Sequence, residues 1–173
     1  MNIFYSMREH YTYSSIFLYS FVMGKLYYMV PIYSLANNNN LQKLHKVIMT
    51  AARAAIGNFC FRKSIQYILT KCKWFDIDDL ILSSSLNTLH KVLTTRKPPG
   101  MVSYFRLNTN ERKVKNISTK YIPTTEKMKK FYIYKYSKLY NSIDQYIKNK
   151  TIKGFKNEIK MCIRAGTIND TMD

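Results

Sequence analysis

Three aspartates close together, Asp76, Asp78 and Asp79, are the side chains of this sequence that most resemble a catalytic group. Neighbouring carboxylates can hold divalent metal ions and so support metal-assisted catalysis. Here they precede a run of apolar residues with helical spacing, as is typical of a first helical turn, where acidic side chains complement the helix dipole. No predicted strand with a partner aspartate comes before them. We therefore expect no catalytic residue and no bound metal.

The other residues that could act as nucleophiles or metal ligands are scattered. The three histidines lie far apart along the chain, at His10, His45 and His90. None of them has a cysteine or a carboxylate at the spacing of a zinc site. The three cysteines are an odd number without a CxxC pair, so we expect a reducing compartment and no disulfide framework. Because a glycine-rich phosphate loop is also missing, the sequence predicts a protein that is not an enzyme and needs no cofactor.

The charge of the chain points to a different kind of function. The sequence has 28 Lys and Arg against 10 Asp and Glu, a formal net charge of +18. Residues 91–173 hold 19 of the basic residues and 6 of the acidic ones, a net charge of +13. Such a segment attracts polyanions, because each neutralised phosphate releases condensed counterions. Base composition is a second explanation, since 21 of the basic residues are Lys, which, like Asn, Ile, Tyr and Phe, has A/T-rich codons.

Nucleic acid is the partner that the charge favours, and we predict three groups of contact residues. These are Lys43, Lys46 and Arg53 on one helix; Arg106, Arg112, Lys113 and Lys115 in a loop; and Lys129, Lys130, Tyr134 and Lys135 in an aromatic–basic segment. In the last group, aromatic rings can stack on exposed bases while lysines neutralise phosphates. The alternative is that the aromatic residues of this segment pack in the core and its lysines form a solvated face.

The elements that must position these residues are predicted to be helices. Apolar residues recur at helical spacing in residues 41–57, 64–72, 77–97, 124–143 and 151–163. Residues 101–123 lack this spacing and predict a basic loop, with a short strand as an option. We expect a mainly α, multi-helix bundle-like fold. Its segments are residues 1–100, helical; 101–123, a basic loop or linker; 124–165, a C-terminal helical segment; and 166–173, a frayed tail.

Residues 16–36 have about the length that spans a bilayer, which takes about 20 residues. Lys25 lies at the middle of this stretch and Pro31 near its end, and both are costly in hydrocarbon. We therefore expect a buried helix that is broken at Gly24 or Pro31. The alternative is a membrane-attached protein, with residues 16–36 inserted and a basic cytosolic domain near anionic lipids.

Two stretches of the chain carry motifs in a recognisable order. The first comprises Lys25–Tyr33, Leu41–Lys46, Ala51–Gly57, Trp74–Ile77 and Leu89–Leu93, and the second comprises Pro123–Thr125, Lys130–Tyr132, Leu139–Ile143 and Phe155–Lys160. Together they resemble the region downstream of the polymerase domain in reverse transcriptases of non-LTR retrotransposons, the jockey-like class among them. The second stretch is similar to the C-terminal end of that family, with Tyr140 where tryptophan is usual.

The resemblance implies the thumb-side and post-polymerase part of such an enzyme. In the family, the catalytic palm lies upstream and holds two metal ions on an aromatic-x-Asp-Asp hairpin. Asp78 and Asp79 do not match that motif, because Asp76 occupies its aromatic position. A thumb of this kind would follow a template–primer duplex through backbone contacts, reading shape and charge rather than sequence.

The sequence thus predicts a non-catalytic remnant or derivative of a retrotransposon reverse transcriptase. We expect it to bind the backbone of RNA or DNA non-specifically and to be intracellular, in the nucleus or cytoplasm, rather than secreted. Besides the membrane-attached protein, an inert translated fragment without a selected function is a further alternative. No pattern in the sequence indicates an oligomeric state.

Overall fold

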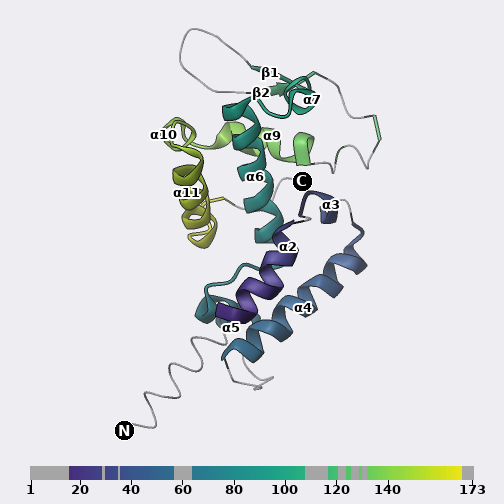
Figure 1. Cartoon of the computed structure of the whole chain (residues 1–173), viewed down its shortest axis with the longest axis vertical. Coiled ribbons are helices and arrows are strands. Elements are labelled where there is room, and N and C mark those ends of the chain that lie inside the picture. Colours follow the sequence, from purple (N-terminus) through teal and green to yellow (C-terminus); the bar gives the residue numbers. More distant parts are fainter. Residues whose placement is uncertain are drawn as a thin grey trace. The chain divides into compact units, whose positions relative to one another are not determined.

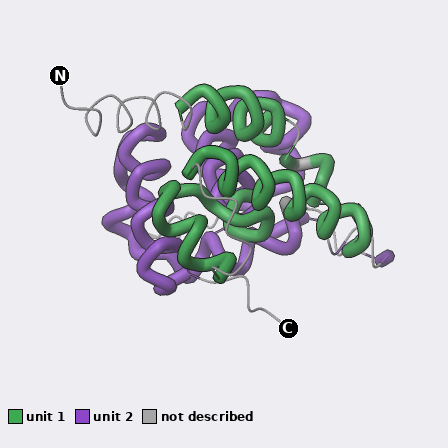
Figure 2. Tube along the Cα trace, turned by 90° about the horizontal axis from the view of Figure 1, so that it is seen from below, with its two compact units in different colours: residues 1–80 green, residues 81–173 purple. Residues whose placement is uncertain are grey.

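The computed structural model describes residues 16–28, 30–34, 36–56, 64–107, 117–120, 124–125, 129 and 132–168. Within these residues the chain is mainly helical, with one two-stranded sheet and short connecting segments (Figure 1), so the predicted fold class, mainly α, is confirmed. The chain divides into two compact units, residues 1–80 and residues 81–173 (Figure 2). The division falls inside helix α6 (Ile77–Thr95), whereas the segments proposed from composition end at residues 100, 123 and 165.

The first unit begins with helical residues 16–28, which include a π-helical turn, η1 (Tyr19–Met23), and α2 (Gly24–Tyr28). Gly24 has helical dihedral angles, so the helix continues through it and the break predicted there is wrong. Beyond Met29, which lies outside the described residues, α3 (Val30–Tyr33) contains Pro31.

The expectation that residues 16–36 form a buried helix is also wrong. Met23, Leu26 and Val30 are buried, but the side chains of Phe17 and Tyr28 are 67% and 83% exposed. The apolar residues of this stretch occur all round the helix, and α4 (Asn38–Ile56) packs on one side of η1. None of the helices in the described ranges is long and apolar enough to cross a membrane.

Helices α4 and α5 (Ile65–Cys72) pack against each other in the first unit (Figure 1). Asn37 caps α4, because its side-chain Oδ1 accepts a hydrogen bond from the Asn40 N–H at 3.0 Å. Ser64 caps α5 in the same way, accepting from the Tyr67 N–H at 3.3 Å. The apolar face predicted for α4 is confirmed in its second half, where Ile48, Met49, Ala51, Ala52 and Ala55 are buried.

The core of the second unit is built from α6, α9 (Tyr132–Ser142) and α11 (Ile152–Arg164). The His90 ring of α6 stacks on Phe155 of α11, with centroids 3.9 Å apart and planes within 5°. His90 Nδ1 also lies 3.1 Å from the hydroxyl of Tyr140 on α9. Burial raises the pKa of Tyr140 to about 12, so this hydroxyl keeps its proton at neutral pH. One buried histidine therefore connects three helices.

A small hairpin occupies part of the segment predicted as a basic loop. After a short helix, α7 (Pro99–Val102), strand β1 (Phe105–Leu107) pairs antiparallel with β2 (Ile117–Thr119). Asn141 of α9 holds β2 through both halves of its side-chain amide. Its Oδ1 accepts from the Ile117 N–H at 2.9 Å, and its Nδ2 donates to the Ile117 carbonyl at 2.8 Å. The amide thus pairs with β2 as a neighbouring strand would.

Capping side chains set where the two helices after α9 begin. Asp144 begins α10 (Gln145–Lys148), a short helix that was not predicted, by accepting from the Tyr146 N–H at 2.6 Å. Thr151 caps α11 by accepting from the Gly154 N–H at 3.2 Å. The tail predicted to fray from residue 166 is ordered at first: Gly166 has φ +70°, and the Thr167 N–H donates to the Cys162 carbonyl at 3.0 Å. This is a left-handed helix end that glycine favours.

We predict that Asn141→Ala lowers the free energy of unfolding by about 2 kcal/mol, because it removes two hydrogen bonds to a part-buried strand and leaves both backbone groups of Ile117 unpaired. Chemical denaturation measures this change. Asn157→Ala is the matched control, since Asn157 is an exposed residue of α11, and a shift of less than about 0.5 kcal/mol is expected there. Equal effects of the two substitutions would contradict the bracing role of Asn141.

Candidate functional site

The three aspartates near the start of α6 serve its N-terminus. Asp76 Oδ1 accepts a hydrogen bond from the Asp79 N–H at 2.8 Å, which makes Asp76 the capping residue. Asp78 is exposed and Asp79 half-buried in the first turn, as the sequence predicts. Among the residues with described positions, no three His, Cys, Asp or Glu side chains are grouped so that they could hold a metal ion.

Asp79 is the carboxyl group of this cluster with a strongly altered proton affinity. Its pKa is raised to about 6, mainly by burial and also by the negative charges of Asp76 and Asp78. A carboxylate ionised at pH 7 in this position is unfavourable to folding. The raised pKa of Asp79 is thus a property of the first turn of α6.

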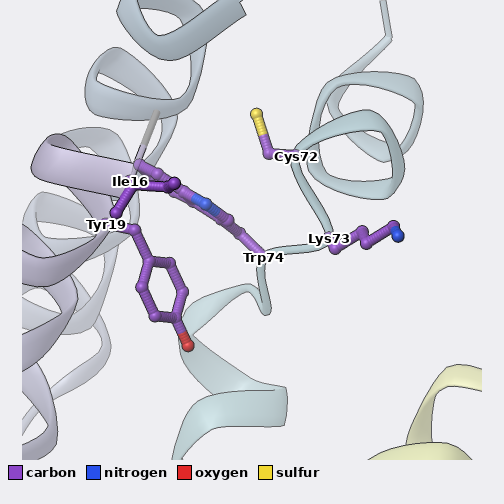
Figure 3. A pocket seen from close by; sticks show the side chains of 5 residues that line it. All are labelled: Ile16, Tyr19, Cys72, Lys73 and Trp74. Carbon is purple, nitrogen blue, oxygen red and sulfur yellow. The ribbon is translucent and has the colours of Figure 1, made fainter. Parts of the chain in front are cut away.

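A pocket of about 260 Å³ lies in the first unit, lined by Ile16, Tyr19, Cys72, Lys73 and Trp74 (Figure 3). Its walls are mainly apolar: the rings of Tyr19 and Trp74 lie 5.6 Å apart between centroids, and Lys73 extends away from the indole (Figure 3). The Cys72 thiol donates to the Ala52 carbonyl at 3.5 Å, and burial raises its pKa. A thiol that keeps its proton is a poor nucleophile, so Cys72 is not activated for covalent chemistry.

The first group of predicted contact residues does come together. Lys43, Lys46 and Arg53 lie three and seven residues apart on α4, so they share one face of this helix, with the two lysines exposed and Arg53 half-buried. The buried residues Ile48, Ala52 and Ala55 project from the opposite side. We call Lys43, Lys46 and Arg53 the basic face of α4.

The other predicted groups are only partly within the described residues. Arg106 is exposed on β1, but Arg112, Lys113, Lys115 and Lys130 lie outside the described residues. Lys129 is exposed, and Tyr134 and Lys135 are half-buried, with the Lys135 ammonium 5.2 Å from the ring centroid of Tyr136. The Tyr136 ring is 1% exposed. At Tyr136, therefore, the aromatic–basic segment contributes to the core rather than to a stacking surface.

Sequence reasoning missed a second basic helix surface, on α11. Its members are spaced three or four residues apart and so form one line along the helix: Lys153, Lys156, Lys160 and Arg164. The buried residues Phe155, Ile159 and Ile163 form a second line, on the adjacent face of α11. The signal that could have found this line is its spacing within a correctly predicted helix. We call these four residues the basic ridge of α11.

The cations of the ridge are close enough to affect one another. Partial burial lowers the pKa of Lys160, and the positive charges of Lys156 and Arg164 lower it further. The two carboxylates in the described part of the second unit are engaged elsewhere, since Asp144 caps α10 and Glu158 pairs with Lys150.

Comparison of the chain with protein-family models, with curated proteins and with solved structures finds no match. The resemblance to reverse transcriptases therefore stays a prediction from the motifs. The geometry supplies two basic helix surfaces, one in each unit, and a mainly apolar pocket in the first unit.

We predict that the free energy of unfolding depends on pH because of the titration of Asp79. Its pKa in the folded protein, about 6, is above the ordinary value of 3.8, so the folded state binds this proton more tightly than the unfolded state does. Stability therefore rises as the pH falls from 7 towards 4. Relative to an Asp79→Asn variant, the parent should gain about 1 kcal/mol over that range, allowing for solvent screening.

Denaturant unfolding at a series of pH values measures this difference. Asp78→Asn is the control, because Asp78 is exposed and burial, the main cause of the shift at Asp79, is unchanged. The control should keep most of the pH dependence of the parent. An Asp79→Asn variant with the same dependence as the parent would show that Asp79 titrates normally.

Proposed function

We propose that this chain binds the sugar–phosphate backbone of RNA or DNA without sequence preference and without catalysing a reaction. The observation that carries the proposal is the basic ridge of α11, four cations in a line along one helix. The basic face of α4 is a second contact surface, in the first unit. Both surfaces offer charge on long, flexible side chains, which suits phosphates better than base edges.

The spacing of the ridge suits a polyanion rather than a single small anion. With a rise of 1.5 Å per residue, neighbouring ridge residues are about 4.5 to 6 Å apart along the axis, and Lys153 to Arg164 spans about 16 Å. A line of this length can contact several successive phosphates. Each contact releases counterions, so affinity would depend steeply on salt.

The origin of the chain is a separate part of the proposal and is supported by the motif order alone. We infer that it is a remnant or derivative of a retrotransposon reverse transcriptase, corresponding to the thumb and the region after the polymerase domain. In that family the thumb follows a duplex through its backbone, which agrees with the use proposed for the two basic helix surfaces. An upstream reading frame encoding a palm with its aspartate motifs would support this origin.

The ridge can be tested by removing two of its charges. We expect the Lys156→Gln/Lys160→Gln variant to bind a fluorescent duplex about tenfold more weakly than the parent near 0.1 M salt, because two phosphate contacts are lost. The slope of log affinity against log salt should fall by about 2. Anisotropy titrations from about 50 to about 300 mM KCl measure both quantities.

The control removes the same charge from the same unit at a different place. Lys91 and Lys138 are exposed lysines on α6 and α9, and Lys91→Gln/Lys138→Gln should change the affinity less than the ridge variant does. Equal losses would mean that net charge governs binding and that the ridge is not the site. A parent protein that does not bind at low salt, or whose affinity ignores salt, would overturn the proposed function.

A further inference from the structure

The hairpin of the second unit has one buried face and one exposed face. Phe105 and Ile117 point to the buried face. The antiparallel register pairs Arg106 with Ser118, and the Lys120 N–H donates to the Tyr104 carbonyl at 2.8 Å, so the same register continues by one more pair. Alternation along the strands places the exposed side chains of Tyr104, Arg106, Ser118 and Lys120 on the other face. We call these four residues the outer face of the hairpin.

The composition of this face is one aromatic ring, two cations and one hydroxyl. The Tyr104 ring is 41% exposed. Paired residues of this kind are about 5.5 Å apart between Cα atoms, and next-but-one residues of a strand about 7 Å apart, so Arg106 and Lys120 are both neighbours of Tyr104. No described residue of the hairpin is acidic.

The backbone holds Tyr104 from both sides. Its N–H donates to the Met101 carbonyl of α7 at 3.2 Å, and its own carbonyl accepts from Lys120 of the facing strand. Because these hydrogen bonds already hold the backbone at Tyr104, it need not be ordered when the ring contacts a ligand, which favours binding.

We propose that the outer face of the hairpin binds one unpaired nucleotide, with its base stacked on Tyr104 and its flanking phosphates on Arg106 and Lys120. This inference rests on the proposed function and specifies a preference within it. Bases of a duplex are covered by their neighbours, so a tyrosine ring on a surface stacks on single strands or on unpaired ends. The basic ridge of α11, which has no aromatic member, binds paired and unpaired strands alike.

The experiment compares two probes on the full-length chain: a fluorescein-labelled single strand of mixed sequence and a blunt duplex of the same sequence. Tyr104→Leu should weaken binding to the single strand about tenfold, the loss of one stacked base, and change duplex affinity less than about twofold. Tyr104→Phe keeps the ring and should bind like the parent. Tyr28→Leu is the matched control, since it removes a more exposed tyrosine from the other unit, and both affinities should stay unchanged.

Stacking can also be measured by tryptophan fluorescence, without relying on a change in affinity. The single native tryptophan, Trp74, is 6% exposed and so is shielded from a ligand. A Tyr104→Trp variant should lose fluorescence when the single strand is added and keep it when the duplex is added. Quenching by neither probe would contradict the proposal.

The outcomes separate this inference from the proposed function. If the parent binds both probes and Tyr104→Leu weakens both equally or neither, the stacking role of Tyr104 is wrong and backbone binding stands. If the parent binds neither probe at low salt, the proposed function fails, and this inference fails with it. Selective loss of single-strand binding, together with quenching of the Tyr104→Trp variant by the single strand alone, supports the inference.

Discussion

The stack of His90 on Phe155 is the contact on which the second unit depends. Both side chains are almost fully buried, and the hydroxyl of Tyr140 lies within hydrogen-bond distance of the same imidazole. Because the three rings come from α6, α11 and α9, the position of each helix is fixed by the other two. A polar ring at the centre of an apolar core favours one arrangement, since its hydrogen bond is made only when Tyr140 is in place. The basic ridge of α11 is thus presented by a helix whose neighbouring face is anchored in the core.

Two consecutive residues of helix α9, Tyr140 and Asn141, link the core of the second unit to the hairpin. Tyr140 faces the core, and the next residue, Asn141, pairs with the backbone of β2 through its side chain. The Asn141 carbonyl accepts in turn from the Lys148 ammonium, which is buried and lies 5.5 Å from the ring centroid of Tyr140. Burial lowers the pKa of Lys148, while Asp144 acts in the opposite direction. A buried cation next to an aromatic ring therefore completes the support of the hairpin.

Much of this fold is local and could be read from the sequence. The helix starts at Asn37, Ser64 and Thr151 follow from capping side chains placed before apolar residues of helical spacing. The hairpin register and the clasp by Asn141 could not be predicted, because they join residues 24 positions apart through backbone groups that every sequence has. The aromatic residues Phe17 and Tyr28 of the first helix were predicted to be buried, but they are exposed. Their number suggested burial, but the packing of α4 on one side decides which of them are covered.

The same line of lysines and arginine that could hold a polyanion works against its own helix. Like charges three and four residues apart repel, and the positive charges of Lys156 and Arg164 both lower the pKa of Lys160. The helix is thus tolerated only because its other side is packed against the core. A polyanion bound along α11 would reduce this repulsion, so by linkage its binding would raise the free energy of unfolding of the protein. The folded state would then be most stable when nucleic acid is bound to α11.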